Sequence, residues 1–142
     1  DWRNGVDANR IEERLRQDAN HSIKAVCCVH HETSCGITSD IASVRKAIDA
    51  TGHPALLLVD SISGLASVDY EHDKWGADVT VSGSQKGLMM PPGLGFNALS
   101  DRAIEAAKKG GSKRSYWDWH EMLASNATGY FPYTPRRRCF MA

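Results

Sequence analysis

The chain has 142 residues, of which 42% are hydrophobic and 24% charged, and its formal net charge at pH 7 is zero. This length allows one modest domain with a hydrophobic core, and zero net charge argues against a general binder of nucleic acids or anionic membranes, which needs a basic excess. No apolar stretch approaches the ~20 residues of a membrane span, and no basic start followed by an apolar run indicates secretion. The first residue is Asp rather than Met, which suggests an internal piece or a processed product.

Helices and strands are predicted to alternate along most of the chain. Apolar residues at helical spacing predict a helix from a cap at Asp7 to about Arg16, and a second helix capped by Thr38 or Ser39 and ended by Gly52. Short, continuous apolar runs indicate strands that are buried on both faces. The predicted strands are 23–30, 55–60, 78–82 and 95–99, and the remaining helices are 101–109 and 116–125. This order predicts an α/β fold with a mainly parallel sheet covered by helices.

Four cysteines are present, two of them adjacent inside an apolar run, which suits small buried side chains better than a disulfide framework. Reduced cysteines favour a cytoplasmic location. A metal site is the alternative, because four possible ligands lie close together in the sequence, but it lacks a second pair of ligands further along. Those four residues are Cys28, His30, His31 and Cys35.

Three polar segments follow predicted strands: 30–34 follows the first, Asp60 and Ser61 the second, and 82–86 the third. In a parallel sheet, the carboxyl ends of the strands meet at one edge, where ligands bind. Each segment alone has an ordinary explanation as a turn, a helix cap or a solvated loop. Their convergence at one edge is what suggests a site.

Pyridoxal-phosphate chemistry needs the residue types that these segments contain. It needs a lysine to hold the cofactor aldehyde as an imine, an acid beside the pyridinium nitrogen, a donor near the phenolic oxygen, and small or amide residues around the phosphate. Lys86, Asp60, Thr33 and the loop 82–85 match these needs in turn. A displaced Lys86 amine would also be able to transfer the proton of transamination.

Three motifs resemble those of the class V pyridoxal-phosphate aminotransferases, and the resemblance covers the chain from about residue 1 to Pro135. They are HHETSCG at 30–36, LLLVDSISGL at 56–65 and SGSQKGLMMPPGLGF at 82–96. Within this family the chain is most similar to the serine–glyoxylate group, and the alanine–glyoxylate and serine–pyruvate groups share the coarser motifs. The resemblance implies that residues 1–135 are the central part of the large cofactor-binding domain of a fold-type I enzyme. Residues 136–142 are then a basic tail outside the family pattern.

The resemblance also implies a role for each matching residue. Lys86 matches the lysine that forms the Schiff base with pyridoxal phosphate, and Asp60 matches the partner of the pyridinium nitrogen. Thr33 matches the hydroxyl residue that bonds the phenolic oxygen, and Gln85 matches a residue of the phosphate loop. Thr134 matches a residue that reaches the phosphate of the partner subunit, which implies a homodimer in the full-length enzyme.

The chain departs from the family pattern at several points. Cys35 stands where the family has Thr, and Phe131 stands where it has Tyr, with Tyr130 and Tyr133 as possible substitutes. The resemblance implies further segments that this chain lacks: a Gly-rich phosphate loop, an aromatic residue stacked on the ring, and a small domain with a carboxylate-binding arginine.

The expected reaction moves the amino group of serine to the cofactor and then to glyoxylate, giving hydroxypyruvate and glycine. The substrates are therefore small amino acids and 2-oxo acids, and neither nucleic acid nor membrane is expected as a partner. Three alternatives stay open: the sister alanine–glyoxylate or serine–pyruvate activity, an incompetent fragment, and a cysteine desulfurase. The last would need a reactive cysteine on a later segment, and Cys139 is in the wrong sequence context for it.

Overall fold

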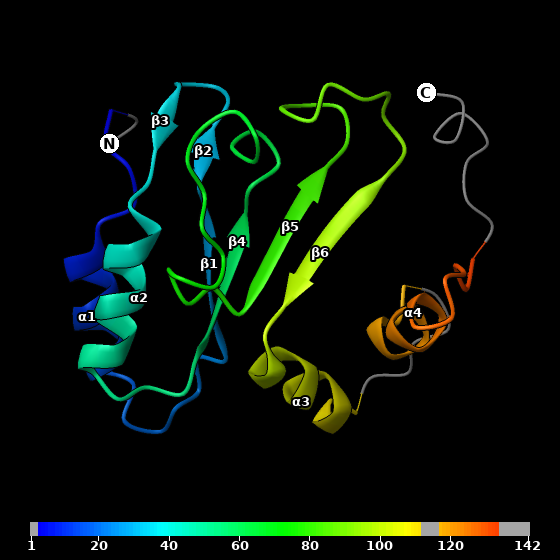
Figure 1. The fold of residues 1–142 in the computed structure, drawn as a ribbon. Helices are drawn as coiled ribbons and strands as arrows, with labels where there is room; N and C mark the ends of the chain where they lie inside the picture. Colours follow the sequence, from blue (N-terminus) through cyan, green and yellow to red (C-terminus); the bar gives the residue numbers. More distant parts are fainter. Residues whose placement is uncertain (1–2, 112–116, 134–142) are drawn as a thin grey trace.

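The structure is a computed structural model that describes residues 3–111 and 117–133 (Figure 1). Most elements lie where the sequence predicts them. In chain order they are α1 (Ala8–Arg16), β1 (Ala25–Val29), β2 (His31–Glu32), β3 (Ile37–Thr38), α2 (Ile41–Ala50), β4 (Leu56–Asp60), β5 (Val79–Gly83), β6 (Gly95–Leu99), α3 (Asp101–Lys109) and α4 (Trp119–Asn126).

Two predicted helix boundaries are confirmed, one by hydrogen bonds and one by a backbone angle. The carboxylate of Asp7 accepts hydrogen bonds from the backbone amides of Asn9, at 3.0 Å, and Arg10, at 3.4 Å. These bonds satisfy amide groups that a helix start otherwise leaves without a partner. After α2, Gly52 has a φ of +63°, which is the left-handed conformation that ends a helix and that glycine adopts most readily.

The predicted start of the second helix is wrong by one or two residues. Asp40 is the cap, because its carboxylate accepts a hydrogen bond from Ser43 N at 3.0 Å. Thr38 instead belongs to the hairpin of β2 and β3, which the sequence did not predict. Ser39 Oγ accepts a bond from Val6 N at 3.3 Å and so holds the N-terminal segment.

Four strands form the main sheet in the order β1-β4-β5-β6. β1, β4 and β5 are parallel, as predicted, whereas β6 runs antiparallel to β5. A direct return through the loop 84–94 explains this difference, because a parallel strand would need a longer crossover connection. The fold is therefore an α/β fold with a mostly parallel sheet.

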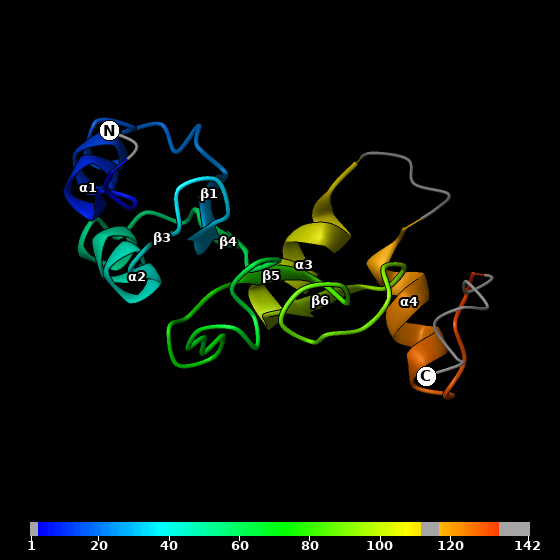
Figure 2. The ribbon, with the colours of Figure 1, turned by 90° about the horizontal axis from the view of Figure 1, so that it is seen from above.

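One face of the sheet is covered and carries the core. Alternate residues of β1 and β4, among them Cys28, Leu57 and Val59, pack against Val44 and Ile48 of α2. The residues between them point to the opposite face, where Cys27 is exposed and Val29 is 38% exposed. Figure 2, viewed from above, has α1 and α2 to one side of the curved sheet and α3 beside β5 and β6.

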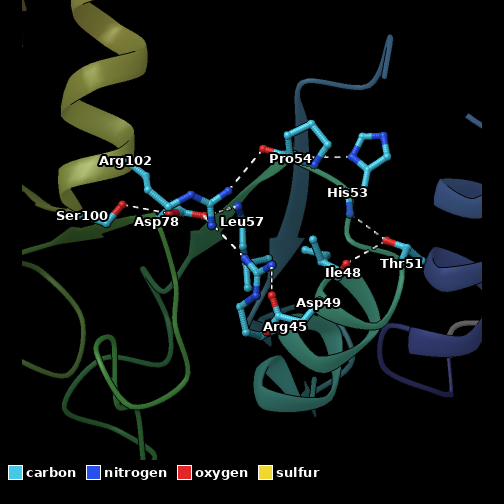
Figure 3. Close-up of polar contacts among 11 residues, drawn as sticks. Arg45, Ile48, Asp49, Thr51, His53, Pro54, Leu57, Asp78, Ser100 and Arg102 are labelled. Atoms are coloured by element: carbon cyan, nitrogen blue, oxygen red, sulfur yellow. Dashed lines mark hydrogen bonds and ion pairs between the residues drawn. The ribbon is translucent and has the colours of Figure 1, made fainter. Parts of the chain in front are cut away.

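Asp78, which is buried just before β5, ties four elements together at the amino-terminal ends of the strands (Figure 3). Its carboxylate accepts a hydrogen bond from Leu57 N at 2.9 Å and another from Ser100 Oγ at 2.8 Å. The guanidinium groups of Arg45, from α2, and Arg102, from α3, lie 3.6 and 3.7 Å from the same carboxylate oxygen. The buried charge is thus compensated, which fixes α2 and α3 relative to the sheet.

A second polar group closes the turn between α1 and β1. The Asp18 carboxylate accepts hydrogen bonds from Ser22 Oγ at 2.6 Å and Ile23 N at 2.7 Å, so the strand begins at Ala25 rather than at the predicted Ile23. His53 Nδ1 accepts a bond from Ala55 N at 3.1 Å, so Nε2 carries the proton and donates to Asp18 at 3.2 Å.

The last helix, α4, begins at Trp119, and the carboxylate of Asp118 caps it through His120 N at 2.9 Å. Its predicted start at Tyr116 lies outside the described residues. Within the described part of the chain, no helix has the length and apolar character needed to cross a membrane.

Candidate active site at the carboxyl ends of the strands

The parallel pairing of β1, β4 and β5 brings the three predicted polar segments to one edge of the sheet (Figure 1). Val29, the last residue of β1, pairs with Asp60, and Asp60 pairs with Val81 of β5. The segments that follow β1 and β5, beginning at His30 and Ser84, therefore leave the sheet on either side of Asp60. Chain positions more than fifty residues apart become neighbours.

Lys86 lines an open cavity of about 650 Å³ at this edge. Thr33 and His31 line the same cavity from the segment after β1, and Ser63 and Ser67 line it from the segment after β4. The cavity therefore combines one primary amine with three hydroxyl groups and an imidazole. Its volume lies within the range of small-molecule sites.

Ser63 is a site residue that the sequence analysis missed. Its hydroxyl lies 2.5 Å from Thr33 Oγ1, so the two hydroxyls are hydrogen-bonded across segments thirty residues apart. A signal was present in the sequence, since small residues dominate the run SISGLAS at 61–67 after the acid. The bond holds Thr33, which is otherwise on an exposed turn, toward the Lys86 cavity.

Asp60 is half-buried at the end of β4 and is not among the residues that line the Lys86 cavity. One of its carboxylate oxygens accepts a hydrogen bond from Ile62 N at 2.9 Å, and its backbone oxygen accepts one from His30 N, also at 2.9 Å. These bonds fix the acid between the two neighbouring strands. The carboxylate has acceptor capacity left for a further donor.

The loop that carries Lys86 is anchored by Ser84, which is fully buried. Ser84 Oγ donates to Pro91 O at 2.7 Å and accepts from Leu94 N at 3.3 Å, which closes the loop on itself. Lys86 and Gln85 are exposed on this anchored loop. The Gln85 amide folds back over Gly83, where an added β-carbon would lie 2.9 Å from Gln85 Oε1.

Two groups near the edge have shifted pKa values. The backbone amide and the hydroxyl of Ser34 both bond the Glu32 carboxylate at 2.9 Å, which lowers the pKa of that carboxyl. Burial lowers the pKa of His30, and neighbouring His31 adds to this, so the His30 ring is neutral at pH 7.

Some predicted features fall elsewhere. Thr134 and the tail 136–142 lie outside the described residues. The Tyr133 hydroxyl accepts from Asp118 N and donates to Glu121, so it is bonded to the start of α4. In the described ranges, no three His, Cys, Asp or Glu side chains form a group that could hold a metal ion.

The residues at this edge fit pyridoxal phosphate. The cavity offers an exposed amine on a rigid loop, hydroxyl donors on the opposite wall, and an acid one strand away. Gly87 lines the cavity and leaves its backbone there without a side chain, as the approach of a phosphate requires.

The family model described as aminotransferase class-V matches residues 4–131. The chain belongs to the class-V aminotransferase family. The serine–glyoxylate aminotransferase of Methylorubrum extorquens is 50% identical in an alignment of 140 positions that covers 95% of this chain and 35% of that protein. The L-aspartate–glyoxylate aminotransferase of Paracoccus denitrificans is 46% identical over 94% of this chain and 34% of its own length.

Solved structures agree with the family. The alanine–glyoxylate aminotransferase of Nostoc sp. superposes with a TM-score of 0.81 at 27% identity, covering 96% of this chain and 36% of that one. The fold is thus that of the fold-type I aminotransferases, and members of the family are enzymes for which pyridoxal phosphate is the implied cofactor. The chain spans about a third of the length of the curated relatives it matches.

Proposed function

We propose that this chain is the cofactor-binding part of a pyridoxal-phosphate aminotransferase that transfers the amino group of serine to glyoxylate. The observation that carries the proposal is the shared cavity of Lys86 and Thr33 at the carboxyl edge of the sheet. The 50% identity to a serine–glyoxylate aminotransferase supports the choice of substrates. The aspartate–glyoxylate relative, at 46%, makes aspartate the second candidate donor.

When bound, the cofactor supplies an electron sink for the bond-breaking step at the substrate α-carbon. Lys86 Nζ would hold the cofactor covalently before substrate arrives and, once displaced, would take the proton from the substrate α-carbon and pass it to the cofactor's aldehyde carbon. Asp60 would hold the ring nitrogen in its protonated form through a charge-assisted hydrogen bond. Thr33, whose hydroxyl is bonded to that of Ser63, would donate to the phenolic oxygen, and Gln85 would contact the phosphate from the anchored loop.

The bounds of the family part, the homodimer and the cellular compartment belong to the same proposal. Residues 1–135 are the family part of the chain and 136–142 the tail. Thr134 would contact the phosphate of the partner subunit in a homodimer. The free cysteines Cys27, Cys28 and Cys35 are compatible with a reducing compartment, and we propose the cytoplasm.

The test is covalent loading of the purified chain. After incubation with pyridoxal phosphate and reduction with borohydride, peptide mass spectrometry should find the label on Lys86. Lys86→Ala should remove this label, whereas Lys74→Ala, a variant of an exposed lysine that does not line the cavity, should leave it unchanged. Labelling spread evenly over exposed lysines would reject the site.

Measurement of turnover distinguishes serine from aspartate as the amino donor, and an active enzyme from an incompetent fragment. Formation of glycine from glyoxylate, with serine and aspartate compared as donors, would identify the substrate and exclude the incompetent fragment. Specific loading of Lys86 without turnover of either donor would support the fragment, which binds cofactor but lacks the groups that bind substrate.

A further inference from the structure

His30 is a buried residue that the proposed mechanism does not use. It is 1% exposed, and its Nδ1 has no hydrogen-bond partner among the residues that the structure describes. A buried polar atom without a partner costs free energy, so its presence needs an explanation other than bonding. The packing of the His30 ring against its neighbours supplies that explanation.

Aromatic rings hold the His30 imidazole on one side. The ring centroids of Tyr70 and Trp75 lie 4.9 and 5.6 Å from that of His30, and they lie 5.2 Å from each other. The Tyr70 hydroxyl is in turn bonded to Thr80 Oγ1 of β5 at 2.5 Å. The imidazole therefore cannot retreat in this direction without disturbing the packing on the sheet.

Gly64 also lies against the His30 ring. A β-carbon on Gly64 would overlap His30 Nδ1 and lie 3.1 Å from Cε1. The backbone of Gly64 does not have a positive φ, so only the lack of space opposes a side chain there. His30 thus sets how closely the loop 61–67, which directly follows Asp60, approaches the sheet.

The same loop also contacts the Lys86 loop. A β-carbon on Gly87, the residue after Lys86, would overlap Leu65 O and lie 2.5 Å from Ser67 Oγ. The loop 61–67 therefore contacts both His30 and the residue after Lys86, with little free space at either contact.

We propose that His30 is a positioning residue which, through Gly64 and the loop 61–67, sets the spacing between Asp60 and Lys86. The expected effect of His30 on cofactor binding rests on the proposed function. Its expected effect on the spacing of Asp60 and Lys86 does not. The ring acts by its shape and rigidity, so this role does not depend on a hydrogen bond at Nδ1.

The experiment uses a pair of complementary variants of the whole chain. Gly64→Ala should push the loop outward, and His30→Ala should leave it unsupported. The double variant His30→Ala/Gly64→Ala places the new methyl group in the space left by the imidazole, so its effects should be smaller than those of Gly64→Ala alone. Val44→Ala is the control, because it removes buried volume from α2, which belongs to neither loop.

The first measurement is amide hydrogen exchange without cofactor, which reports local opening. Gly64→Ala should lower protection about tenfold both in 61–67 and in 84–90 relative to β4, and the double variant should restore it in part. Val44→Ala should lower protection without preference for these loops. Equal loss in all elements for Gly64→Ala, or no recovery in the double variant, would overturn the proposal.

The second measurement is a titration of the chain with pyridoxal phosphate. It gives the dissociation constant of the complex and the absorbance maximum of the bound cofactor. Gly64→Ala should raise the dissociation constant about tenfold, with partial recovery in the double variant and no change in Val44→Ala. A wild-type chain that takes up no cofactor would refute the proposed function, and the exchange data would still decide the spacing. A chain that binds cofactor equally well in all variants would refute the role of His30.

Discussion

At the amino-terminal ends of the parallel strands the carboxylates of Asp78 and Asp18 are bonded to neighbouring groups of the chain, whereas at the carboxyl ends polar side chains line an open cavity. Asp78 faces two guanidinium groups and two further donors, and Asp18 has three partners. Lys86 and Thr33, at the other end, lie exposed on loops. The same strands thus use polar residues for stability at one end and leave them available for a ligand at the other.

The largest effect should come from breaking the amino-terminal cluster. Asp78→Ala leaves Arg45 without its buried carboxylate and should lower the free energy of unfolding by about 3–5 kcal/mol, measured by urea denaturation. Lys86→Ala, at the exposed end, should change it by no more than about 0.5 kcal/mol. Comparable losses in both variants would remove the distinction between the two ends.

Acid should affect the two ends at different pH values. The pKa of His30 is lowered by burial and by His31, with Asp69 opposing. The unfolded chain therefore takes up this proton first, and the free energy of unfolding should fall as pH drops from about 6.5 toward the folded pKa. His30→Phe should flatten this part of the profile.

The amino-terminal end should respond only in stronger acid. The Ser22 hydroxyl and then the Ile23 amide hold the pKa of Asp18 well below its usual range. Its carboxylate therefore stabilises the folded chain above about pH 4, and this contribution is lost as the pH falls further. Asp18→Asn should reduce the dependence below pH 4 and leave the His30 region unchanged. A profile in which both variants alter the same pH range would contradict the assignment.

The smallest effect concerns reactivity and compares the two faces of one strand. Burial raises the pKa of the Cys28 thiol to about 11, and adjacent Cys27 is exposed. Iodoacetamide at pH 8 should therefore alkylate Cys27 at least about tenfold faster than Cys28, as read by tandem mass spectrometry. Exposed Cys35 provides the internal standard. Equal rates would show that the covered face of β1 opens to solvent.

Local chemistry explains which predictions the structure confirmed. The Asp7 cap, the Gly52 helix end and the continuous apolar strands depend on residues close in sequence, so composition and spacing were enough. The cap at Asp40 was missed because Thr38 and Ser39 are equally suitable residue types, and pairing of β2 with β3 removes Thr38 from the helix. Near the site, Lys86, Thr33, Asp60 and Gln85 stood in recognisable motifs.

The sequence by itself determined the family, the strand order along the chain and the residue types available at the carboxyl ends. Only the tertiary structure decided the antiparallel direction of β6, the bond between Thr33 and Ser63, and the contact of Gly64 with His30. These features join residues many positions apart, and their energies depend on close packing and on hydrogen-bond distance rather than on local preference. A glycine in a loop is a common turn residue in sequence, and only the structure shows that a buried imidazole lies against this one.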